Sequence, residues 1–311
     1  MLNLTTVAPW LQKQGIYGPV TATLDWCEIN HQFSPYIAEI ANSFSNLFTI
    51  GISLCGLREA NVPNKELPTR YGIGYLGVAL VGLGSFFFHA TLLFEAQLAD
   101  ELPMIYVGSM SLFLLFDNKP GFGINNSRSQ LLLVLLALFD VLFTWSYMIY
   151  RNPVYHQLVF GILVITTVIR VMYILKYTDA AERIPPKKKA DIANFFTTGA
   201  IMFAVGFGVW NLDNIFCGHL TNWKLSLGWP WAFLLEGHSW WHVLTGLGTY
   251  YMYIGIQCES IWLISSFMQS YVLYLRTSEV ITLCTKDDPK NYEVQTKWGM
   301  PHVKLIRSKV Q

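Results

Sequence analysis

The sequence predicts an all-α membrane protein, a bundle of seven transmembrane helices with a lumenal N-terminus and a cytosolic C-terminus. Hydrophobic residues make up 53% of the 311 positions and charged residues only 13%, whereas soluble domains carry about 25% charged residues. Seven apolar segments each approach the roughly 20 residues that cross a bilayer. The net charge of +1 gives no basic field that would attract nucleic acid.

The expected spans follow one another from residue 35 to residue 257. They are residues 35–57, 71–93, 99–116, 130–150, 154–175, 192–212 and 230–257. Residues 1–34 lack the continuous apolar stretch of a signal peptide, and they are expected to form an N-terminal segment on the lumenal side. Residues 35–260 then form the bundle, and residues 261–311 form a helical extension followed by a cytosolic tail.

The distribution of Lys and Arg orients the predicted bundle. Ten of these residues lie in the loops 58–70, 117–129 and 176–191, which share one side if there are seven spans. The opposite side carries only Lys13, Arg151 and Lys224. Cytoplasmic loops are enriched in Lys and Arg, so the basic side and the C-terminal tail are predicted to face the cytosol.

Two pairs of polar residues stand one helical turn apart inside predicted spans. Ser85 and His89 form the first pair, and His238 and His242 form the second. Asp100 is expected in the first turn of the third span. Polar groups in a membrane are costly and usually functional, and the predicted topology places all five in one layer, in the outer half of the membrane.

Three neutral imidazoles and an open fourth position make a good zinc site. Zinc activates water and polarises a carbonyl, Asp100 could exchange a proton with that water, and Ser85 could donate to an oxyanion. Spacing alone leaves structural roles equally open, with Asp100 as a helix cap and Ser85 as a small packing residue. Glu236 is interpreted as a rim charge, and Asp140 and Asp213 as interfacial.

A second polar cluster occupies the N-terminal segment. Asp25, Glu28 and Asn30 offer hard oxygen ligands within a short loop, and Glu39 returns from the first turn of the first span. Hard oxygens suit calcium. The spacing matches no EF-hand, so a capped loop with Glu39 near a helix N-terminus remains the alternative.

The five cysteines divide between the two sides of the predicted topology. Cys27 and Cys217 fall on the lumenal, oxidising side, where disulfides form. Cys55, Cys258 and Cys284 fall toward the cytosol.

Four runs of residues together resemble a known family. They are Tyr17–Asn30, Ser34–Asn42, Gly84–Leu92 (Gly-Ser-Phe-Phe-Phe-His-Ala-Thr-Leu) and His238–Gly246 (His-Ser-Trp-Trp-His-Val-Leu-Thr-Gly). They are similar to the N-terminal signature and the two histidine motifs of alkaline ceramidases. The resemblance extends in order from about residue 10 to about residue 258.

The resemblance implies a seven-helix intramembrane zinc amidase, related to the adiponectin receptors, that cleaves ceramide to a sphingoid base and a free fatty acid. Ser85 and Asp100 would be the catalytic partners. The implied zinc ligands are His89, His238 and His242; the implied calcium site is Asp25, Trp26 through its carbonyl, Glu28, Asn30 and Glu39; and the implied disulfide joins Cys27 to Cys217. The implied location is the endoplasmic reticulum membrane, with the Golgi as the alternative. The preferred ceramide and the oligomeric state stay open.

Three other readings compete with this one. A receptor-like member of the same superfamily would bind zinc structurally and signal through its cytoplasmic face. A transporter would use His and Asp as a metal-free proton relay. A haem protein would use the paired histidines as axial ligands.

Overall fold

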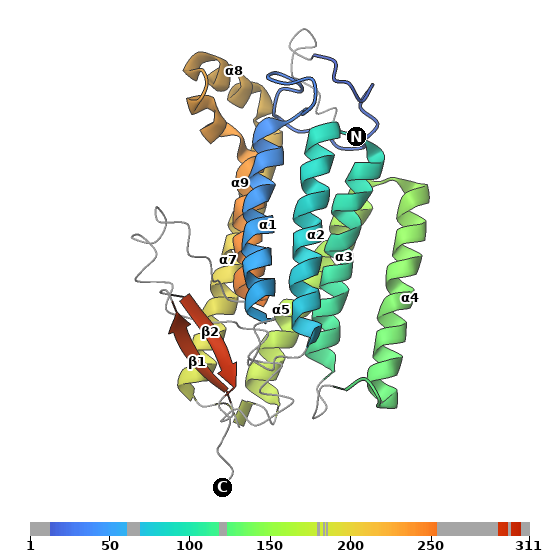
Figure 1. Cartoon of the computed structure of the whole chain (residues 1–311), viewed down its shortest axis with the longest axis vertical. Coiled ribbons are helices and arrows are strands. Elements are labelled where there is room, and N and C mark those ends of the chain that lie inside the picture. The colour runs from blue at the N-terminus through green and yellow to red at the C-terminus, as the bar shows by residue number, and fades with distance from the viewer. Residues whose placement is uncertain are drawn as a thin grey trace.

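The computed structural model describes residues 13–60, 69–117, 123–178, 181–182, 184, 186–253, 292–297 and 300–305. Long helices run side by side along the longest axis of the molecule (Figure 1). Their bounds are α1 Ile40–Ala60, α2 Thr69–Thr91, α3 Phe94–Phe116, α4 Ser127–Tyr150, α5 Pro153–Tyr177, α7 Pro186–Ile215 and α9 Gly237–Tyr253. A shorter helix, α8 (Cys217–Leu227), and a 3-10 turn, η2 (Trp231–Leu235), connect α7 to α9.

Six helices of the described part are long and apolar enough to cross a membrane, namely α1 to α5 and α7. Each of them overlaps most of one of the first six predicted spans, so these predictions are confirmed as helices of spanning length, although α1 begins only at Ile40. The chain is thus a multi-pass helical bundle. The C-terminal tail adds an antiparallel pair, β1 (Tyr292–Lys297) and β2 (Met300–Leu305), which the pattern did not predict. The expected extension at 261–275 lies outside the described residues.

The seventh predicted span starts later in the structure than in the sequence pattern. Residues 230–236 form η2 and a bend, and α9 begins only at Gly237. The Asp213 carboxylate, at the end of α7, accepts a hydrogen bond from the Gly237 backbone N–H at 3.0 Å. This capping contact satisfies a free amide of the first turn, and the described part of α9 has 17 residues.

The helices pack in an order that brings distant segments together. α1 contacts α2 and α9, α2 lies between α1 and α3, and α7 packs along α9. α4 contacts α3 but stands at the margin of the bundle (Figure 1). α2 and α9, the helices that carry the two histidine pairs, therefore both neighbour α1.

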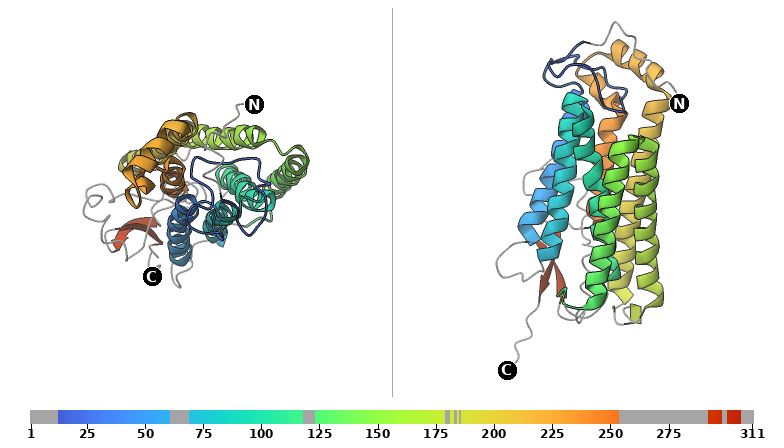
Figure 2. Two further views of the ribbon diagram at one scale, coloured as in Figure 1. Left: turned by 90° about the horizontal axis from the view of Figure 1, so that it is seen from above. Right: turned by 90° about the vertical axis from the view of Figure 1, so that its right-hand side faces the viewer.

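The N-terminal segment crosses one end of the bundle, and α8 lies at the same end (Figures 1 and 2). Cys27 and Cys217 are joined there, with their Cα atoms 5.3 Å apart, which is normal disulfide geometry. The disulfide pairing implied by the resemblance is thus confirmed. The bond links the N-terminal segment to the first residue of α8 across 190 positions of sequence.

A glycine allows α2 and α3 to touch through their backbones. A Cβ added to Gly84 would lie 2.0 Å from the Ala99 carbonyl oxygen and 2.7 Å from the Asp100 backbone nitrogen. Neither atom belongs to a flexible side chain, so only a residue without a Cβ fits. This contact holds Ser85, the next residue on α2, against Asp100.

Gly84→Ala is expected to push the two helices apart. Overpacking of this kind costs about 1–3 kcal/mol, and a displacement of about 1 Å at a reacting group can cost roughly 100-fold in rate. Activity and melting temperature of purified variants would be compared with Gly161→Ala, since a Cβ at Gly161 of α5 meets nothing within 4 Å. Equal activity of both variants would show that the α2–α3 contact does not position the site.

The interpretation of Asp140 as an interfacial residue is wrong. Asp140 lies in the middle of α4 and accepts a hydrogen bond from the Ser109 hydroxyl of α3 at 2.6 Å. A serine one helix away can satisfy a carboxylate at this depth, which sequence periodicity does not reveal.

Candidate metal centre

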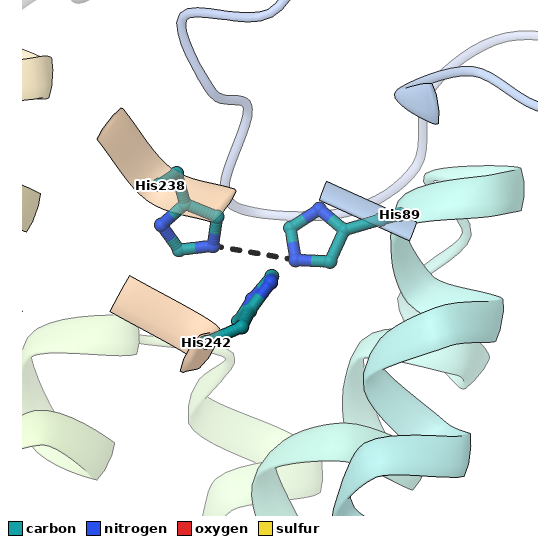
Figure 3. Close-up of side chains that lie close together, drawn as sticks. All are labelled: His89, His238 and His242. Carbon is teal, nitrogen blue, oxygen red and sulfur yellow. Dashed lines mark hydrogen bonds between the residues drawn. The ribbon is translucent and has the colours of Figure 1, made fainter. Parts of the chain in front are cut away.

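Three histidines converge at the end of the bundle that the N-terminal segment covers. His89 comes from the last turn of α2, and His238 and His242 come from the first two turns of α9 (Figure 3). One ring nitrogen of each can be chosen so that all three lie within 4.8 Å of one another, and all three residues are buried. The Nε2 atoms of His89 and His238 are 3.3 Å apart. Two imidazole lone pairs repel at that distance unless a proton or a cation lies between them.

A carboxylate orients the His89 ring. The Nδ1 atom of His89 is 2.5 Å from Oε2 of Glu39, the residue that immediately precedes α1. Both side chains are almost fully buried. When Nδ1–H donates to the carboxylate, Nε2 carries the free lone pair, which is the usual arrangement of a metal-binding histidine.

His242 is held from α1. Its Nδ1 atom lies 2.8 Å from the Ser45 hydroxyl and 3.3 Å from the Asn46 amide. The Ser45 hydroxyl itself donates to the Asn42 carbonyl at 2.9 Å, so its oxygen accepts from Nδ1–H of His242. As with His89, the Nε2 lone pair is then directed toward the other histidines.

His238 is held by stacking rather than by a hydrogen bond. Its Nδ1 atom has no hydrogen-bond partner among the described residues. The indole of Trp26 lies parallel to the imidazole, with centroids 3.6 Å apart and planes inclined by 13°. The resemblance implied a role only for the Trp26 carbonyl, and the structure adds this side-chain contact.

Ser85 and Asp100 border the three histidines. The Ser85 hydroxyl lies 3.5 Å from His242 Nε2 and hydrogen-bonds to the Asp100 carboxylate. α3 starts at Phe94, so the expected place of Asp100 in the first turn is wrong and Asp100 is no helix cap. In the first turn of α3, Gln97 is buried and accepts a hydrogen bond from the Thr23 amide at 2.8 Å.

The site is shallower, measured from the helix ends, than the predicted spans implied. His89 is two residues from the end of α2, and His238 is the second residue of α9. At 1.5 Å per residue these positions are about 2–3 Å from a helix end. The five polar groups lie together at the end of the bundle that the N-terminal segment covers, and their depth in the membrane stays a prediction.

The N-terminal loop brings several oxygen atoms together without enough donors. Glu28 uses both carboxylate oxygens to accept from the backbone amides of Ala41 and Asn42, at 2.7 and 2.9 Å. Asn30 Oδ1 and Glu39 Oε1 are buried and have no hydrogen-bond partner in the described structure. Buried polar atoms are normally satisfied, so these oxygens fit a cation.

Burial and neighbouring carboxylates disfavour the ionisation of the carboxyl groups in this loop. Burial raises the pKa of Asp25. Burial, and then the charge of Glu236, raises the pKa of Glu28 to about 8. Burial, followed by the charges of Asp25 and Glu28, raises the pKa of Glu39 well above its usual range. A divalent cation would remove this conflict and keep the carboxylates ionised.

Glu236 differs from its predicted role. It is not a rim charge, because it is buried and accepts from Lys224 Nζ at 2.9 Å. Lys224, which the sequence placed among the few positive charges of the lumenal side, is itself buried, with an exposure of 0%. Asp213 lies at the end of α7 as predicted.

The residues on α1 that hold His242 were missed by the sequence reasoning, although a signal exists. Asn42, Ser45, Asn46, Thr49 and Ser53 recur every three or four positions, which places them on one helix face. Thr49 donates to the His242 carbonyl at 3.3 Å. A polar stripe inside an otherwise apolar span predicts contact with a polar partner.

Fold and site together define a multi-pass helical membrane protein with a buried cluster of three histidines that could hold a metal ion. Comparison with known proteins then specifies the family. The profile of the Ceramidase family matches residues 18–303. Alkaline ceramidase 3 of Mus musculus is 36% identical over 244 residues, which cover 78% of this chain and 86% of the relative.

Two more relatives agree. Alkaline ceramidase YPC1 of Saccharomyces cerevisiae is 34% identical over 252 residues, 78% of each chain. Putative alkaline ceramidase dcd3A of Dictyostelium discoideum is 32% identical over 274 residues, covering 78% of this chain and 87% of the relative. The chain belongs to the alkaline ceramidase family and is a hydrolase, as the resemblance implied.

Proposed function

We propose that the protein is an intramembrane zinc amidase that hydrolyses the N-acyl bond of ceramide, including dihydro- and phytoceramide. One observation carries the proposal: three buried histidines direct nitrogen atoms at one point beside Ser85 and Asp100, in a chain of the ceramidase family. His89, His238 and His242 would hold the zinc.

The chemistry divides among the metal and two side chains. Zinc supplies Lewis-acid polarisation of the carbonyl and lowers the pKa of water. Asp100 takes a proton from the attacking water as its oxygen bonds to the carbonyl carbon. Ser85 donates a hydrogen bond to the oxyanion. When the C–N bond breaks, Asp100 returns the proton to the amine, releasing a sphingoid base and a fatty acid.

The membrane setting suits this substrate. Ceramide is a lipid amide that reaches the site from the bilayer, and α2 and α9 bring the polar groups close to the end of the bundle. We propose seven spans, with α9 as the seventh, the covered end in the lumen and the C-terminal tail in the cytosol. The basic loops support that orientation. The endoplasmic reticulum is the proposed membrane, with the Golgi as the alternative.

Calcium is proposed to bind the N-terminal loop through Asp25, the Trp26 carbonyl, Glu28, Asn30 and Glu39. Its role would be to hold the loop rather than to take part in chemistry. Glu39 links both sites, because one oxygen faces His89 and the other has no partner. Trp26 provides a second link through its stacking on His238.

Glu39→Ala is expected to weaken zinc binding and activity by about 10–100-fold, as loss of a partner of a metal-binding histidine usually does. It should also remove the calcium dependence of the reaction. Glu39→Gln should retain more zinc, because its amide oxygen still accepts from His89. Rates with and without calcium would be measured beside Glu95→Ala, an exposed glutamate in the first turn of α3. Full retention of zinc and calcium dependence in Glu39→Ala would refute the link.

The proposal is tested by hydrolysis of a fluorescent ceramide by purified protein at alkaline pH, with metal content measured by mass spectrometry on the same sample. Cleavage together with bound zinc supports the amidase. Zinc without cleavage of any ceramide would favour the receptor-like reading. Absence of zinc would refute the three-histidine site. The family match favours neither the transporter nor the haem protein.

A further inference from the structure

A buried lysine reaches the N-terminal loop from α8. Lys224 is fully buried, and its Nζ atom donates to the Cys27 carbonyl and to Glu236 Oε2, each at 2.9 Å. Lysine is almost never fully buried unless it is paired. The pairing with Glu236 makes the buried charges neutral as a unit, but it leaves open why the ammonium also holds a backbone carbonyl.

The carbonyl that Lys224 holds belongs to the residue between two proposed calcium ligands. Cys27 stands between Trp26, whose carbonyl is a proposed ligand, and Glu28. Fixing the Cys27 carbonyl fixes the peptide plane that it shares with the Glu28 amide. The directions in which the Trp26 carbonyl and the Glu28 side chain leave the backbone are then restricted too.

Two buried oxygen atoms of the N-terminal loop indicate that the loop has room for a cation. Asn30 Oδ1 and Glu39 Oε1 are buried and lack partners, although a single donor near either would satisfy it. Lys224, the buried cationic donor beside the loop, bonds to Cys27 and Glu236 instead of to these two oxygens. The lysine therefore shapes the loop without filling the place of a cation.

We propose that Lys224 is a positioning residue for the cation loop: its ammonium ties the Cys27 carbonyl to α8, which leaves the ligand oxygens arranged for a calcium ion. The inference rests on the proposed calcium site. It adds a third tie between α8 and the N-terminal segment, beside the disulfide and the packing of Ile29 against the disulfide cysteines.

The direction of the effect separates positioning from simple charge repulsion. If Lys224 only repelled calcium, its removal would tighten calcium binding. Lys224→Met alone would leave Glu236 buried and unpaired, which is strongly destabilising. The double variant Lys224→Met/Glu236→Gln removes both charges, so the local net charge is unchanged. The hydrogen bond to the Cys27 carbonyl is then the interaction that is lost.

The experiment measures calcium affinity by equilibrium binding of radioactive calcium to the purified full-length protein, with zinc content and disulfide formation checked on each variant. The double variant is expected to bind calcium about 10-fold or more weakly, the effect typical of losing a residue that orients metal ligands. Glu236→Gln keeps the ammonium–carbonyl bond but leaves the buried Lys224 charge unpaired, so it measures the cost of that charge alone. Lys224→Arg should restore most of the affinity, because a guanidinium can donate to the same carbonyl.

Lys13→Met is the matched control. Lys13 also donates to a backbone carbonyl of this segment, that of Gln32 at 3.0 Å, but the bond is exposed. Its loss should leave calcium affinity unchanged. As a second readout, the calcium concentration that gives half-maximal activity should rise in the double variant while the maximal rate at saturating calcium stays near that of wild type.

Four results would overturn the inference. Wild-type affinity in the double variant would refute it while leaving the calcium site intact, and tighter binding would show that Lys224 acts by repulsion. A large loss of calcium affinity in folded Lys224→Arg would also refute it, even if the double variant failed to fold, because that variant keeps the charge pair and a donor to the Cys27 carbonyl. Failure of the wild-type protein to bind calcium would refute the calcium site and this inference together, without touching the zinc amidase.

Discussion

His238→Ala is expected to lose zinc and ceramide hydrolysis together, to the detection limit of both assays. A catalytic zinc site keeps three protein ligands and one open position, so removal of one imidazole leaves two. The remaining pair, His89 and His242, comes from different helices and gives no chelate on a single helix face. Metal content by mass spectrometry and hydrolysis of a fluorescent ceramide would be measured on the same preparations.

His238 is the most informative of the three histidines for this experiment. His89 is bonded to Glu39 and His242 to Ser45, so their replacement would also leave buried polar groups without partners. The Nδ1 atom of His238 has no hydrogen-bond partner among the described residues, so its replacement leaves no such partner unsatisfied. The replacement mainly removes a ring that stacks on Trp26. Its replacement therefore tests the metal with the least disturbance of the hydrogen bonds nearby.

The control is His219→Ala, which replaces an exposed histidine of α8. It should keep zinc and activity at the wild-type level. If His238→Ala retained bound zinc, the three histidines would not form the metal site. If it lost zinc and still hydrolysed ceramide, the metal would be structural and the proposed chemistry would be wrong.

The histidine constellation was predictable from the sequence because it has a period. His238 and His242 are four residues apart on one helix, Ser85 and His89 are four apart on another, and both pairs interrupt apolar runs. The six long helices were predictable for the same reason, since a run of apolar residues of fixed length reports bilayer thickness. Helix ends differ from the predicted ends by several residues where a contact with a distant residue fixes the first turn. The hydrogen bond from the Gly237 amide to Asp213 is such a contact at the start of α9.

The groups that hold the histidines were harder to predict because their partners come from distant segments. Glu39 was assigned to calcium alone, and nothing in its position indicates that His89, 50 residues away, ends beside it. Lys224 was counted only as a positive charge on the lumenal side, and only the fold shows that it is buried and paired with Glu236. Burial of a charge depends on the whole chain, so local pattern cannot predict it.

Asp100→Asn is expected to lower the maximal rate by about 10²–10⁴-fold, the usual contribution of a positioned proton-transfer group, while zinc content stays at the wild-type level. The amide has the shape of the carboxylate and keeps a hydrogen bond to Ser85, but it can neither take a proton from water nor give one to the leaving amine. Asp140→Asn is the matched control, because Asp140 is also an aspartate within the bundle that accepts from a serine, Ser109 at 2.6 Å.

The pair of aspartates separates proton transfer from the mere presence of a carboxylate among the helices. Only Asp100 has a serine partner that also reaches a histidine of the centre, since Ser85 lies 3.5 Å from His242 Nε2. A proton-relay transporter would lose transport in Asp100→Asn and show no ceramide hydrolysis in either protein. If Asp100→Asn hydrolysed ceramide at the wild-type rate, Asp100 would have no part in proton transfer, and another group beside the centre would have to carry the proton to the amine.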